Sequence, residues 1–92
     1  MSAHTGALEA VDRIVNRGGD VPAEVVAALH DRLFAWVALV PGPEAGTRGG
    51  DEIVVGVTAG VELRAVPRAP SPRDLPLLER VALLVSAHVP AR

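Results

Sequence analysis

The residues of this chain that could do chemistry are few and widely spaced. No two of its histidines, at positions 4, 30 and 88, have the i, i+4 spacing with which a helix presents two metal ligands. Ser86 and His88 lie two residues apart, so on a helix they point in different directions and form no nucleophile and base pair. The spacing therefore predicts no catalytic residue and no metal site.

Composition excludes further reaction classes. The chain has no Cys, and all 9 of its basic residues are Arg. The first absence excludes disulfides, thiolate metal ligands and thiol nucleophiles. The second excludes Schiff-base chemistry and the lysine of a phosphate-binding P-loop. We expect a protein that is not an enzyme and carries no cofactor.

Charge and hydropathy patterning limit the partners. The formal net charge is -2 and the only aromatic residues are Phe34 and Trp36, which disfavours nucleic acid, since its binding rests on clustered positive charge and stacking aromatic rings. The best apolar run, at 33–40, is too short to span a membrane, and the N-terminus lacks a secretory signal pattern. We expect a cytoplasmic protein, and the initiating Met and the closing helical pattern favour a complete chain.

The segment "PGPEAGTRGGDE" (41–52) could be a phosphate cradle or a short connection. A cradle requires backbone N–H groups at the start of a helix, usually with a Lys or a Ser/Thr at fixed spacing. This segment leads into an apolar strand pattern and the chain has no Lys, so the flexible connection is the favoured interpretation. Arg48 is left free to contact a partner.

Hydrophobic periodicity gives the elements that must position any site. Apolar residues at helical spacing predict helices over 7–17, capped by Thr5, over 21–32, capped by Asp20, and over 74–89 with Asp74 as cap. Strands are predicted over 33–40, covered on both faces, and over 52–58 and 61–67. This order predicts a single α+β domain over 1–92, with an antiparallel sheet of about three strands and helices on one face.

The register of the last two strands can be predicted from the pattern. A three-residue loop, 58–60, with Gly60 left-handed, places Ile53, Val55 and Val57 on the same face as Val61, Leu63 and Ala65. The opposite face is then mixed. On it Glu62 and Arg64 alternate beside Gly56, and Trp36 of the neighbouring strand could add an apolar wall. These four residues are the candidate ligand site, although a plain surface ion pair is the favoured interpretation of the two charges.

Several stretches resemble the GAF family of small-molecule-binding sensory domains. They are the opening helix "ALEAVDRIVN", the second helix "VPAEVVAALHDRL", the strand "FAWVALV" and the closing "SPRDLPLLERVALLVSAHV". The resemblance implies a GAF- or profilin-like fold. The chain departs from the family where longer members build helices and loops over a ligand, because only 41–52 stands there. It also lacks the bilin-attaching and sulfoxide-reductase cysteines and the Asn-Lys-x-x-Phe motif of cyclic-nucleotide binders.

The same resemblance implies a homodimer through the first and last helices, whose apolar faces are broader than a small sheet should cover. The residues expected at that interface are Leu8, Val11, Val15, Leu78, Val81 and Val85. We expect a sensory or regulatory module that binds a small ligand on the open sheet face. The alternative is a ligand-free adaptor, comparable to roadblock-type proteins, that binds a signalling protein by the same face or by the sheet edge. A closed pocket above about 300 Å³ would favour the first, and a flat apolar face the second.

Overall fold

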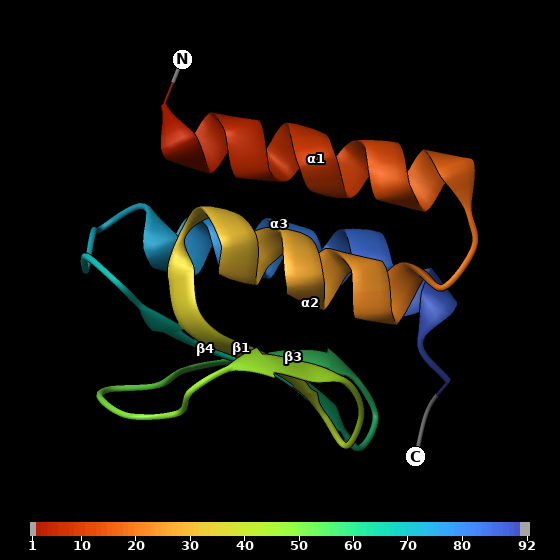
Figure 1. Cartoon of the computed structure of the whole chain (residues 1–92). Helices are drawn as coiled ribbons and strands as arrows, with labels where there is room; N and C mark the ends of the chain where they lie inside the picture. Colours follow the sequence, from red (N-terminus) through yellow and green to blue (C-terminus); the bar gives the residue numbers. More distant parts are fainter. Residues whose placement is uncertain (1, 91–92) are drawn as a thin grey trace.

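A computed structural model describes residues 2–90 and has an α+β fold, as predicted (Figure 1). Its elements are α1 (Ala3–Arg17), α2 (Val21–Arg32), β1 (Phe34–Val40), β2 (Glu44–Gly46), β3 (Ile53–Thr58), β4 (Val61–Pro67), α3 (Asp74–Val85) and the 3₁₀ turn η1 (Ser86–His88). The strands form one antiparallel sheet in the order β2-β1-β4-β3. Helices α2 and α3 pack on one face of the sheet, and α1 lies on top of them.

The helix boundaries follow the capping residues. The predicted cap of the first helix was wrong, because α1 begins at Ala3 and its cap is Ser2, whose Oγ accepts a hydrogen bond from the Thr5 backbone N–H at 3.1 Å. The cap of α2 is confirmed, since the Asp20 side chain accepts from the Ala23 N–H. Asp74 was predicted to precede the last helix and is instead the first residue of α3.

The sheet has four strands where three were predicted. The additional strand, β2, is part of the segment interpreted as a flexible connection, and it pairs with β1 through Val37 opposite Ala45. The Leu39 N–H donates to the Pro43 carbonyl at 3.0 Å, which closes the turn between the two strands. Three residues with no apolar alternation give no strand signal, so only the pairing with β1 reveals β2.

Gly46 ends β2 at a point where no side chain fits. Its φ is +90°, and a Cβ there would overlap the Ala35 carbonyl oxygen and stand 2.7 Å from Cε1 of His30. The His30 ring is itself fixed, because its Nδ1 lies 2.9 Å from the Phe34 carbonyl oxygen. Glycine is therefore required here by backbone conformation and by close packing together.

The predicted register of the β3–β4 hairpin is confirmed along most of its length. Ile53 pairs with Ala65 and Val55 with Leu63, so the apolar residues share the face that α3 covers. At the tip the ladder shifts by one residue, and Thr58 rather than Val57 pairs with Val61. Gly60 is left-handed, with φ 78°, as the turn requires.

Strand β1 is buried on both faces, as its uniformly apolar sequence predicted. Phe34, Val37 and Leu39 belong to the main core beneath the helices, whereas Trp36 and Ala38 form a second small cluster with Val66 on the other face. The face of the sheet turned away from the helices is therefore partly closed.

The residues predicted to form a helical dimer interface are mostly inside the monomer. Val11, Leu78, Val81 and Val85 are each 0% exposed, because α1 packs on α2 and α3 and uses these side chains in the core. They are not available to a second copy of the folded chain, so this assignment is corrected. Leu8 and Val15 are partly buried against the same core.

Replacing Gly46 by Ala should lower the free energy of unfolding by about 2–4 kcal/mol, because the new methyl group forces β2 away from β1. Chemical denaturation followed by circular dichroism measures the change. Gly49→Ala is the matched control, since a Cβ there meets nothing within 4 Å. Equal stabilities of the two variants would contradict the packing argument.

Candidate functional site

The sheet face turned away from the helices carries a chain of alternating charges. Nη2 of Arg64 donates to Glu62 at 2.7 Å, Nη1 of Arg64 lies 3.4 Å from Oε2 of Glu52, and Glu52 is also paired with Arg48. The hydrogen bond and charge of Glu62, with a smaller contribution from Glu52, raise the pKa of Arg64 above its usual range. Each of these four side chains, those of Arg48, Glu52, Glu62 and Arg64, thus already has a partner of opposite charge.

Trp36 stands at the centre of the same face and is nearly covered. Its exposed fraction is 3%, its Nε1–H donates to Oε2 of Glu44 at 2.8 Å, and the Arg48 guanidinium lies 5.2 Å from the ring centroid. The connection after β2 therefore lies over the indole, held by a cation–π contact and by the Arg48–Glu52 ion pair. The indole is therefore covered and does not form an exposed apolar wall of a ligand site.

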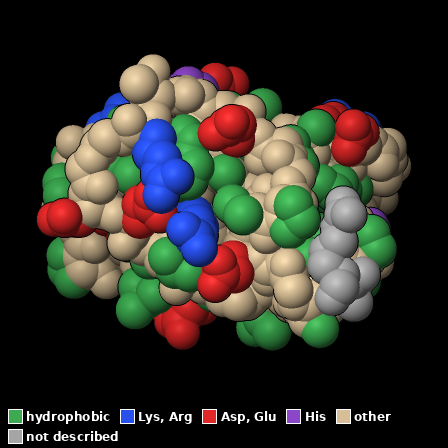
Figure 2. All heavy atoms as spheres, turned by 90° about the horizontal axis from the view of Figure 1, so that it is seen from below, with side chains coloured by type: hydrophobic (Ala, Val, Ile, Leu, Met, Phe, Trp, Pro, Cys, Tyr) green, Lys and Arg blue, Asp and Glu red, His purple; other side chains and the backbone are tan. Residues whose placement is uncertain are grey.

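The four predicted ligand-site residues are not gathered in one pocket. Trp36 and Arg64 share an open groove of about 260 Å³ with Arg48, whereas Gly56 lines a different groove beside α3. Glu62 lines neither groove and is paired with Arg64. Figure 2 looks onto this side of the molecule, where acidic and basic side chains lie next to one another with hydrophobic ones scattered among them. Neither of these two grooves is a closed pocket above 300 Å³, and the mixture of charges leaves no flat apolar surface among the described residues of this face.

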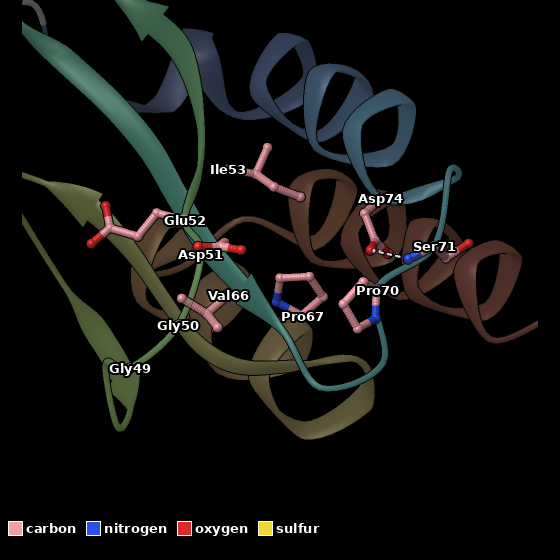
Figure 3. A pocket seen from close by; sticks show the side chains of 10 residues that line it. All are labelled: Gly49, Gly50, Asp51, Glu52, Ile53, Val66, Pro67, Pro70, Ser71 and Asp74. Atoms are coloured by element: carbon pink, nitrogen blue, oxygen red, sulfur yellow. Dashed lines mark hydrogen bonds between the residues drawn. The ribbon is translucent and has the colours of Figure 1, made fainter.

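A larger hollow of about 380 Å³ lies between the 49–53 segment, the end of β4 and the start of α3 (Figure 3). Val66, Pro67 and Pro70 give it an apolar wall. Asp74, the buried charged residue of the described chain, borders it and is 2% exposed. Nε2 of His4 lies 2.7 Å from one carboxylate oxygen of Asp74, and the Ser71 backbone N–H donates to the other at 2.8 Å.

This arrangement makes Asp74 a structural link. It joins the start of α1, through His4, to the turn that precedes α3, and both of its oxygens have partners. Ser71 contributes its backbone N–H, while its Oγ accepts a hydrogen bond from the Arg73 N–H. No nucleophile and base pair results. Within residues 2–90 no group of three or more His, Cys, Asp or Glu side chains could hold a metal ion.

The two edges of the sheet differ sharply, and sequence reasoning missed this difference. At one edge β2 has only three residues, follows Pro43 and bears a Glu, features that discourage pairing. At the other edge β3 has the sequence IVVGVT, with six residues and neither charge nor proline. Its outer side therefore presents backbone N–H and C=O groups with no charged residue or proline to discourage pairing, and the ladder is irregular only between Gly56 and Thr58.

Exposed apolar side chains flank the β3 edge. Val54 is 46% exposed on the strand, and Leu83 of α3 is 70% exposed. A groove of about 260 Å³ between helix and strand is lined by six residues: Val55, Gly56, Val57, Glu79, Ala82 and Leu83. A scan for uncharged strand segments would have found β3, but only the strand order shows that it lies at an edge.

Comparison with known proteins adds no relative: no family model, curated protein or solved structure matches this chain. In the part of the chain that the structure describes, the helices are all too short or too polar to cross a bilayer.

Arg48→Ala should expose the indole of Trp36, the single tryptophan of the chain, and make its fluorescence at least twice as sensitive to acrylamide. The loss of stability should stay below about 1 kcal/mol, because Arg48 is largely in solvent. Arg13→Ala, on the exposed side of α1, serves as control and should leave quenching unchanged. Unchanged quenching in Arg48→Ala would contradict the covering role.

Asp74→Ala should lower the free energy of unfolding by about 2–3 kcal/mol, because it leaves the His4 ring and the Ser71 N–H without their partner. His4→Ala should cost less, and the double variant should lose less than the two single losses combined. Urea denaturation of the four proteins measures this coupling. Additivity within about 0.5 kcal/mol would show that the pair does not act as a unit.

Proposed function

We propose that this chain is a non-enzymatic protein-interaction module of GAF-like architecture, which docks an extended protein segment on the free edge of β3. The observation that carries the proposal is the contrast between the two sheet edges. One is short, charged and preceded by proline, and the other is a six-residue apolar strand open to pairing. A strand added there gains backbone hydrogen bonds along the regular part of β3, from Ile53 to Gly56.

The chemistry of the docked segment follows from the surroundings of β3. Side chains that point toward the helices would enter the groove beside Leu83, so alternate positions of the segment should be apolar. Glu79 is the charged residue among those lining the groove, and it favours a neutral or basic side chain near it. The segment is thus an uncharged or weakly basic strand.

A small-molecule sensor is supported less well. The groove that holds Trp36 and Arg64 falls below the volume of ordinary ligand pockets, and a ligand with an anionic group would have to displace Glu52 or Glu62 from Arg64. The adaptor role, which dispenses with a ligand, requires no such rearrangement.

An acetylated and amidated peptide that reproduces residues 53–59 is a suitable probe, because its sequence, IVVGVTA, is uncharged and apolar at alternate positions. Titrated into the labelled protein, it should shift the backbone NMR signals of β3 and of Ala82 and Leu83 by strand addition. The signals of Ala45, in β2 at the other edge, should not move.

Leu83→Asp should weaken this binding at least fivefold, because it adds a charge to the groove beside β3. Leu75→Asp is the matched control: it alters an exposed leucine of the same helix outside that groove. Shifts confined to the residues around Trp36, or no shifts at all, would overturn the proposed function.

A further inference from the structure

We infer that β3 pairs with β3 of a second copy. The two strands run antiparallel about a two-fold axis that passes between the two copies of Val55. This inference rests on the proposed function and names its partner. An isologous interface needs a surface that is complementary to itself, and an uncharged strand meets this need because no like charges meet along the joined backbones.

The pleat selects the register. For both copies to keep their helices on the same side of one continuous sheet, paired residues must belong to the same face. Pairing Val55 with the second Val55 achieves this. Ile53 then lies opposite Val57 on the helix side, and Val54 lies opposite Gly56 on the other side.

The side chains favour this register over its neighbours. Val54 is 46% exposed, and the space where a Cβ of Gly56 would stand is empty to 4 Å, so the valine of one copy lies beside a gap in the other. A two-fold axis at Val54 would bring Glu52 opposite Gly56, near the centre of the ladder, whereas the axis at Val55 leaves Glu52 at the end of the ladder, opposite Thr58. An axis at Gly56 would put two glycines face to face and leave the centre without side-chain contact.

The flanking helices extend the interface. Leu83, at 70% exposed, lies on the side of α3 that borders the β3 edge, so joining the strands brings the two α3 helices side by side. Glu79 would then be near its counterpart, and this repulsion weakens as salt screens it. A strand pair with two leucines is a small interface, so we expect a weak dimer whose population depends on protein concentration.

Site-directed crosslinking tests the register, because the chain has no native cysteine. Val55→Cys should form a disulfide-linked dimer at least tenfold faster than Thr58→Cys, since only residue 55 meets its own counterpart on the axis. Leu8→Cys on α1 should crosslink as slowly as Thr58→Cys.

Light scattering of the unmodified protein from 1 to 500 μM should show a dimer whose dissociation constant is lower at high salt than at low salt. Leu83→Asp should raise this dissociation constant at least tenfold. A monomer throughout that range, or preferential crosslinking through Leu8→Cys, would overturn the inference. If the 53–59 peptide still bound β3, the proposed function would stand with another partner. If the peptide failed as well, both proposals would fall.

Discussion

The fold depends on burying β1 on both of its faces. Seven consecutive residues without a polar side chain gain from burial whichever way they point, so one face needs the helices and the other needs a second cover. Phe34, Val37 and Leu39 find the first cover in the core. For Trp36 the second comes from Val66 and from the Arg48 guanidinium above the ring.

That second cover explains the glycine-rich segment 41–52. It forms β2 beside β1, turns at Gly46 where the backbones nearly touch, and lies over the sheet so that Arg48 reaches the indole and Glu52 reaches Arg64. The GAF-like interpretation treats this segment as a shortened bridge where longer proteins build a lid. In this chain the short segment is itself the cover, and it fills the place where a pocket was expected.

Closing that face changes which part of the molecule is free to act. Glu44, Glu52 and Glu62 are each bonded to a neighbour, so a polar ligand would gain contacts only by breaking existing ones. The backbone groups along the outer side of β3 have no such partners within the sheet, because β3 is the last strand. The groups of the sheet that can still form hydrogen bonds therefore lie along the outer side of β3, which is why we propose this edge as the binding site.

The sequence by itself determined most of the architecture. Apolar periodicity and capping residues predicted three helices and three of the four strands, and the alternation of charge in 61–67 predicted the hairpin register, because burial of one strand face permits few alternatives. The sequence could not determine which strands pair or which surface covers each apolar helix face. The three residues of β2 acquire their structure only from β1, and Val11, Leu78 and Val81 have the same apolar pattern whether they face a second chain or the protein's own helices. Tertiary packing decided both, because burial against any apolar surface stabilises such a side chain, and in this fold α1 packs on α2 and α3 of the same chain.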